Sequence, residues 1–185
     1  MINYDVALHS ANWPTFQALQ ECIDRRGWPV KLDGEASAEW TKPLGKVPRT
    51  LGIPVVFKGE PIQLEASFVT LGGDQRVAIN NKLSSIGATG RSFDEGDRVL
   101  TLTLRANIKE YQAGFYVMAA LIKCFDGYGF HGRSHGASHY ADALVSEAAA
   151  LDSEGTTPIQ PDDVRVKRML DGFLDLSNKQ DLRRK

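Results

Sequence analysis

Two segments of this chain each place a helix pattern after a strand pattern, and this repeated order constrains the fold more than any other feature. Residues 3–9 alternate, and residues 11–27 carry apolar side chains at helical spacings of three and four. Residues 98–105 also alternate, and residues 109–126 form the most apolar helix of the chain. Helices in this setting cover one face of a sheet. The sequence therefore predicts an α+β fold with two long helices on one face.

The two helix segments resemble each other when the first is shifted along the chain by 102 residues. Either the strand–helix unit is pseudo-duplicated, or two amphipathic helices that end in the same way simply look alike. The predicted layers are the same in both cases. The matching positions are Ala11/Ala113, Ala18/Ala120, Leu19/Leu121, Cys22/Cys124, Asp24/Asp126 and Gly27/Gly129.

The middle of the chain supplies further strand patterns, at residues 28–32, 53–57, 62–71 and 76–83. Gly72, Gly73 and Asp74 form a tight-turn signal before the last of them, which predicts that residues 76–83 return as a strand. Residues 33–52 and 84–96 are rich in turn-forming residues and predict long surface connections. Together these patterns predict a mostly antiparallel sheet of about six strands with one solvated face.

The C-terminal part of the chain is helical in character. Residues 138–151 are alanine-rich and predict a helix for which Ser138 is a candidate N-cap. Residues 161–176 predict a second helix, which opens with a proline and two aspartates that suit the positive end of the helix dipole. We therefore divide the chain into an α+β sandwich core, residues 1–136, and a C-terminal helical extension, residues 137–185, packed on the same domain.

The charge balance argues against nucleic acid as a partner. The chain has 22 basic and 23 acidic residues, a net charge of −1 with histidine neutral. It therefore lacks the broad positive field that non-specific binding of nucleic acid requires.

The longest apolar run of the chain, residues 115–122, is far shorter than the roughly 20 residues of a membrane span. We expect neither nucleic acid nor a membrane as a partner.

The first residues and the two cysteines bear on the compartment. The N-terminal stretch lacks a basic region and places Asp5 within its only apolar segment, which is not typical of a secretory signal. Cys22 and Cys124 are too few for a disulfide framework and fall within predicted helices, so we interpret them as free, buried cysteines. These observations predict a cytoplasmic protein.

Three of the four histidines lie close together, at His131, His135 and His139. On a helix, this spacing would align the imidazoles on one face, where they can share a zinc ion, with Asp142 and Glu147 downstream as oxygen ligands or a general base. The two glycines between them each disfavour a helix by about 1 kcal/mol, which favours a loop that leads into the next helix. A zinc site and an incidental polar loop are both open interpretations.

The same loop is a candidate anion site. Gly132, Arg133 and Ser134 offer flexible backbone N–H groups and an arginine close to the start of the following helix. This combination can hold a phosphate or a carboxylate. Tight turning explains the glycines equally well.

No residues have the spacing of a known nucleophile or acid–base pair, so a non-catalytic function is the leading hypothesis. We expect a cytoplasmic module that binds another protein and neutralises or scaffolds it, as an immunity protein does, with a homodimer as a further option. The alternative is a metal-dependent hydrolase in which the three clustered histidines, with His9 as a further ligand, hold zinc and activate a water. A sensor that binds a small ligand between the sheet and its loops is the third hypothesis.

Overall fold

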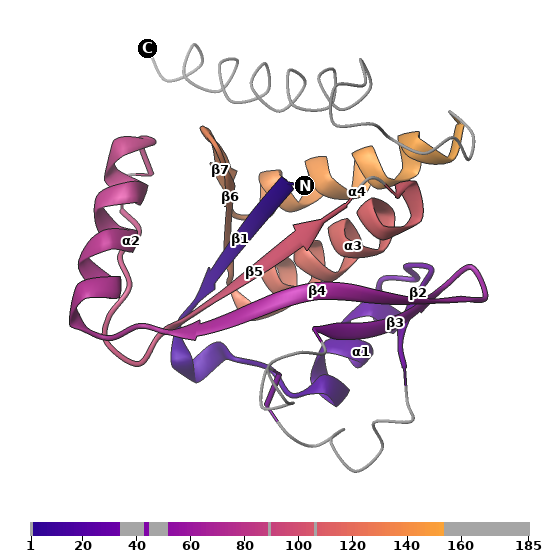
Figure 1. Ribbon diagram of the computed structural model, residues 1–185, viewed down its shortest axis with the longest axis horizontal. Coiled ribbons are helices and arrows are strands. Elements are labelled where there is room, and N and C mark those ends of the chain that lie inside the picture. The colour runs from indigo at the N-terminus through magenta and orange to yellow at the C-terminus, as the bar shows by residue number, and fades with distance from the viewer. Residues whose placement is uncertain (1, 34–42, 45–51, 89, 106, 154–185) are drawn as a thin grey trace.

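A computed structural model describes residues 2–33, 43–44, 52–88, 90–105 and 107–153 of the chain (Figure 1). These residues form an antiparallel sheet of seven strands in the order β2-β3-β4-β5-β1-β6-β7. The strands are β1 (Ile2–Leu8), β2 (Val30–Leu32), β3 (Ile53–Phe57), β4 (Glu60–Thr70), β5 (Arg98–Leu104), β6 (Tyr128–His131) and β7 (Ser134–Gly136). The helices are α1 (Phe16–Arg25), α2 (Gly73–Ser85), α3 (Ile108–Phe125) and α4 (Ser138–Ser153), with a short 3-10 turn, η1 (Ser10–Asn12). The predicted α+β class is confirmed, with seven strands in place of about six.

Three helices cover one face of the sheet, as Figure 1 shows. α3 lies across the middle of this face and contacts α1 on one side and α4 on the other. Gly114 permits the close approach of α3 to β5, because a Cβ atom there would lie only 2.8 Å from Cδ2 of Leu104. The main core fills the space between these helices and the sheet, and its largest fully buried members include Tyr4, Phe16, Leu19, Phe57, Leu64 and Phe115.

α4 belongs to the same core. Leu144, Ala148 and Leu151 are buried in it, and the side-chain amide of Gln112 in α3 donates to the carbonyl of Ala148 at 2.7 Å. The helix predicted at residues 138–151 is therefore confirmed and packs on α3, whereas the predicted helix at 161–176 lies outside the described residues. Among the helices described, none is long and apolar enough to cross a membrane.

The predicted returning strand at residues 76–83 is wrong, because this segment lies within helix α2. Ile79 and Leu83 are four residues apart, so a helix brings both side chains to one face, where they pack against a second, smaller hydrophobic cluster. The side chain of Asn80 also exchanges two 2.9 Å hydrogen bonds with the backbone of Phe93. Tertiary contacts of this kind fix the helix, and the local alternation does not show them.

The glycine-rich segment predicted as a loop forms the β6–β7 hairpin instead. Gly129 and Gly136 face each other across it. A Cβ atom on Gly129 would lie 2.6 Å from the ring of Tyr140, and one on Gly136 would lie 3.0 Å from the Cβ atom of Tyr140. The glycines therefore allow α4 to pack directly on the hairpin.

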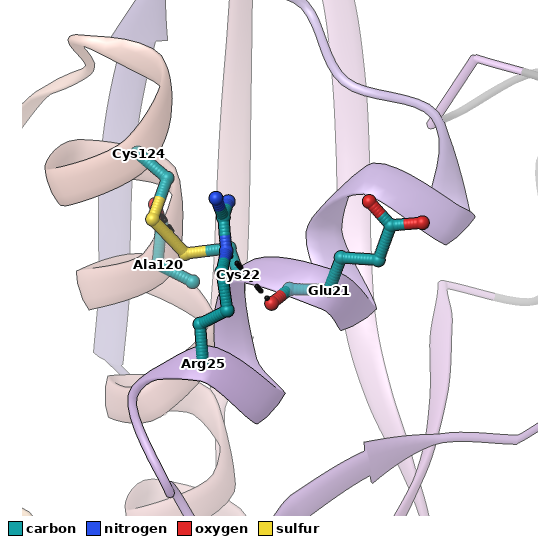
Figure 2. The surroundings of a disulfide bond; sticks show 5 residues. All are labelled: Glu21, Cys22, Arg25, Ala120 and Cys124. Atoms are coloured by element: carbon teal, nitrogen blue, oxygen red, sulfur yellow. Dashed lines mark hydrogen bonds between the residues drawn. A yellow bond between two sulfur atoms is a disulfide. The ribbon is translucent and has the colours of Figure 1, made fainter.

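The interpretation of the cysteines as free is also wrong. Cys22 in α1 and Cys124 in α3 form a disulfide, with Cα atoms 6.3 Å apart (Figure 2). These are the two cysteines that the shift of 102 residues matched, and 102 residues separate them. The adjacency of the two helices on the sheet, which neither segment reveals alone, brings the sulfur atoms together.

Candidate functional site

His131, the first of the predicted zinc ligands, ends β6 on the face of the sheet that the three helices cover. Its Nδ1 lies 2.6 Å from the carbonyl oxygen of Asn3, so this nitrogen carries a proton and donates it. The ring stacks on Tyr4 with centroids 4.4 Å apart. Tyr4 is buried against Phe115 in the main core, and burial raises the pKa of its hydroxyl. The imidazole of His131 is therefore tied to β1.

His135 and His139 do not join His131. His135 lies opposite Phe130 in the hairpin, and neighbours along a strand face opposite sides, so its side chain lies on the other face from that of His131. Nδ1 of His135 lies 2.6 Å from the hydroxyl of Tyr128. His139 is exposed in the first turn of α4. The structure does not bring the three predicted zinc ligands together.

The carboxylates predicted to accompany the histidines are separate as well. Asp142 accepts a hydrogen bond from Nζ of Lys123 at 2.8 Å, and Glu147 is half-buried further along α4. Within the described parts of the chain, no three His, Cys, Asp or Glu side chains are grouped so that they could hold a metal ion. The zinc site stays a prediction, and no geometry in these residues supports it.

The predicted anion ligands divide between two environments. Gly132 and Arg133 form the exposed turn of the hairpin, whereas Ser134 is buried opposite His131, facing the helices. Ser134 is therefore not available to a ligand at the turn. Only the first two residues present themselves to solvent together.

A hollow of about 510 Å³ lies beside this turn. It is bounded by β1, β5, the last turns of α2 and the start of the hairpin turn, and Figure 1 shows α2 standing beside this end of the sheet. Its lining residues are Ile2, Asn3, Asp5, Lys82, Thr101, His131 and Gly132. The hollow thus joins two of the predicted site residues, His131 and Gly132, to four polar side chains that the sequence did not single out.

An ion pair with a third polar partner crosses the hollow. Nζ of Lys82 donates to Oδ2 of Asp5 at 2.9 Å, and the hydroxyl of Thr101 donates to Oδ1 of the same carboxylate at 2.6 Å. The ammonium also lies 4.6 Å from the centroid of the Phe130 ring, in a cation–π contact. Asp5 of β1 and Phe130 of β6 therefore hold the amino group of Lys82 in place, and Thr101 of β5 fixes the carboxylate of Asp5.

A second polar cluster joins the end of β1 to the loop before β5. Asp97 is 4% exposed and accepts 2.8 Å hydrogen bonds from Nδ1 of His9 and from the backbone N–H groups of Ser10 and Asp94. Burial opposes ionisation of Asp97, but these hydrogen bonds outweigh it and lower its pKa. In a neutral imidazole whose Nδ1 donates, the lone pair lies on Nε2, the arrangement of a general base or a metal ligand.

Sequence reasoning named His9 but missed Asp97. The local signal was the turn-forming composition of Asp94, Glu95 and Gly96 just before it. The bond from the N–H of Asp94 to Asp97 is not the usual aspartate turn, in which the side chain accepts from an N–H later in the chain. The contact with His9 spans 88 residues and had no signal.

Polar side chains form two rows across the face of the sheet that the three helices leave open. Side chains in register on neighbouring antiparallel strands lie side by side on one face. In the order β4, β5, β1, the rows are Ser67–Thr101–Asp5 and Glu65–Thr103–Asn3. A third row, which includes Val99 and Ala7, belongs to the small cluster that also holds Leu83 of α2. α2 therefore covers one end of this face and leaves the two polar rows exposed or half-exposed.

Comparison with known proteins identifies no relative of this chain: no family model, no curated protein and no solved structure matches it. A function therefore has to be argued from the geometry described above.

Proposed function

We propose that this protein is a non-catalytic interaction module that binds another protein and neutralises or scaffolds it. The proposed contact is the open face, defined as Asn3, Asp5, Glu65, Ser67, Thr101 and Thr103. The observation that carries the proposal is the coverage of the sheet, because α1, α3 and α4 all pack on one side. A solvated sheet face of this kind offers a broad surface, which suits a protein better than a small ligand.

The composition of the open face suits a protein interface. Its two acidic side chains are paired with basic residues at its margin, Glu65 with Arg105 and Asp5 with Lys82, so charges of both signs are present. Val69 continues the exposed side of β4 next to Ser67 and is 40% exposed, which adds an apolar contact to a polar surround. Interfaces between separately folded proteins mix polar and apolar area in this way.

The experiment that tests the proposal compares two surfaces of the same protein. Ser67→Arg and Thr103→Arg place bulk and charge on the open face, and Ser146→Arg places the same side chain on the exposed side of α4 as the matched control. Each variant and the wild type are used to capture partners from an extract of the source cells. We expect a partner that the wild type and the Ser146→Arg variant retain and that both open-face variants lose. A partner set that all the variants share would contradict the proposal.

The disulfide bears on the compartment in which a partner would be met. Disulfides persist in oxidising compartments and are rare in the reducing cytosol. The cytoplasmic location was inferred in part from the interpretation of the cysteines as free, which the structure contradicts. The location stays a prediction, and the cysteines no longer support it. Acid quenching of cells followed by alkylation tests it, because two alkylated cysteines indicate a reducing compartment and none indicates an oxidising one.

The zinc-dependent hydrolase, the alternative function, has no geometric support at present. His131 and His135 are fastened on opposite faces by separate hydrogen bonds, and a shared metal would require the hairpin to rearrange. A structural or catalytic zinc site of this kind would hold about one zinc ion per chain. We expect protein prepared without a histidine tag to contain less than about half an equivalent of zinc. A full equivalent that His135→Ala removes would restore the alternative.

A further inference from the structure

We propose that the hollow beside the hairpin turn binds a small anionic group, a carboxylate or a phosphate, with Lys82 as its principal ligand. The hollow shares Asn3, Asp5 and Thr101 with the open face, but the binding of an anion in it does not depend on the docking of a protein on that face. This proposal makes Lys82 the principal ligand in place of Arg133 and Ser134. Of the anion site that the sequence indicated, Gly132, Arg133 and Ser134, only Gly132 lines the hollow.

The two members of the ion pair differ in their access to solvent. The side chain of Lys82 is 46% exposed, whereas that of Asp5 is 17% exposed. A ligand that enters the hollow therefore meets the ammonium more readily than the carboxylate. The carboxylate also already accepts from both Lys82 and Thr101, one hydrogen bond at each oxygen.

Lys82 retains donors for a ligand. An ammonium has three N–H groups, and the contact with Asp5 uses one of them. Asp5 and the ring of Phe130 hold the ammonium in place, so a ligand loses less side-chain entropy on binding it than on binding a free surface lysine. Lys82 is in this sense arranged for binding before the ligand arrives.

The hairpin turn adds an accessible backbone and a second cation. Gly132 has a φ angle of +56°, and a Cβ atom placed there would have no other atom within 4 Å. The peptide groups of the turn are therefore open to a ligand, and the exposed Arg133 follows directly. Arg133 does not line the hollow, so its charge acts on a bound anion at longer range than that of Lys82.

The anion has two sources that this chemistry does not distinguish. One is a free small acid or inorganic phosphate, and the other is an acidic side chain of a bound protein. Both present the same oxygen atoms to Lys82, since charge-assisted hydrogen bonds to carboxylate and phosphate are alike in geometry.

The test is an NMR titration of the full chain, labelled with ¹⁵N, that follows the backbone amides of Thr101 and Gly132. The probes are inorganic phosphate, succinate, a glutamate blocked at both termini, and glucose as a neutral polar probe. We expect saturable shifts with one or more of the anions and none with glucose. Shifts with phosphate or succinate assign a free ligand, and shifts with blocked glutamate alone assign an acidic side chain of a protein.

Two variants with opposite expected effects make the test specific. Lys82→Met should weaken anion binding about tenfold or more, because it removes a charge-assisted hydrogen bond. Asp5→Asn should tighten binding several-fold, because it removes the competing charge. Lys123→Met is the matched control, since Lys123 also forms a 2.8 Å pair with an aspartate, Asp142, but outside the hollow, and it should leave affinity unchanged.

Three results would overturn the proposal. The first is the absence of chemical-shift changes with every anion. The second is binding of glucose whose affinity falls in both the Lys82→Met and the Asp5→Asn variants, which would define a neutral polar site. The third is equal loss of affinity in Lys82→Met and Lys123→Met, which would show a general charge effect. None of these results bears on the open-face variants, so the two proposals fail separately.

Discussion

Reduction of the Cys22–Cys124 disulfide is the perturbation with the largest effect that the structure predicts. The bond joins the first helix of the helix layer to the central one, across 102 residues of sequence. In the chain-entropy description, a cross-link restricts the unfolded chain more when the loop it closes is longer. A loop of this length corresponds to about 4.7 kcal/mol at 25 °C.

Changes in the folded state alter this expected loss of free energy of unfolding only slightly. Cys22 is fully buried, and two thiols occupy nearly the same volume as the disulfide, so the reduced wild type retains the packing of α1 on α3. We therefore expect reduction to lower the free energy of unfolding by about 3–5 kcal/mol. For a chain of this size, such a loss lowers the melting temperature by roughly 6–20 °C.

The assay is urea unfolding of the wild type in its oxidised form and after reduction under denaturing conditions and refolding with reductant present. The control is a Cys22→Ala, Cys124→Ala double variant, whose stability should not respond to reductant. If the wild type unfolds at the same urea concentration in both forms, and mass spectrometry shows the disulfide in one of them, the loop-closure reasoning is refuted. Two alkylated cysteines in the protein purified without reductant would instead refute the pairing itself.

Three further perturbations test the contacts that shape the sheet and the loop around it. Asp97→Ala should lower the free energy of unfolding by about 2–4 kcal/mol. Because hydrogen bonds lower the pKa of Asp97 below its unfolded value of about 3.9, this contribution is complete above the unfolded pKa and is lost as pH falls through the folded pKa. The urea unfolding curves of the wild type and the variant should therefore converge in acid. Asn80→Ala removes both hydrogen bonds to the backbone of Phe93, and amide exchange in α2 should accelerate about tenfold while that of β5 does not change. Gly127→Ala places a Cβ atom 2.9 Å from the carbonyl oxygen of Leu121, and we expect a loss of about 1–3 kcal/mol in thermal unfolding, which an unchanged melting temperature would contradict.

The two strand–helix units could be predicted because the periodic pattern of apolar residues that identifies them lies within each element. In β5, Leu100, Leu102 and Leu104 are buried against the helices and the residues between them are not fully buried, so period-two alternation identifies the strand. α3 is apolar on nearly all sides because it lies between the sheet, α1 and α4. Elements whose burial is periodic are visible in the sequence.

α2 and the β6–β7 hairpin could not be predicted on the same basis. α2 buries only Leu83 among its residues, so it has no apolar stripe to distinguish it from a strand. In the hairpin, Gly129 and Gly136 are required by the packing of Tyr140, a residue of α4, and locally they indicate only a loop. In both elements the deciding contact comes from a different part of the chain.

The candidate sites were harder still to predict, because register assembles them. Asp5, Lys82 and Thr101 come from three elements, with separations in sequence of 77 and 96 residues. Conversely, the three clustered histidines are close in sequence, but the hairpin places His135 opposite Phe130, and adjacent residues of a strand such as Phe130 and His131 face opposite sides. Closeness in sequence indicated convergence only under the helical interpretation, which the glycines already disfavoured.

The order of elements connects the repeated pattern to the proposed binding surfaces. Each predicted unit continues in the structure as strand, helix and hairpin: β1, α1 and β2–β3, then β5, α3 and β6–β7. Because β1 and β5 pair antiparallel, a two-fold axis between them would exchange these two strands, and the disulfide joins the matched Cys22 and Cys124. With β4 set aside, the same axis would exchange β3 with β6 and β2 with β7, so the paired strands of the two units do not correspond in chain order. Under the duplication hypothesis, β4 and α2 are the segment inserted between the units, and β4 separates β3 from β5 in the sheet. That inserted segment supplies Glu65 and Ser67 of the open face and Lys82 of the hollow, so both proposed sites depend on the part of the fold that breaks the repeat.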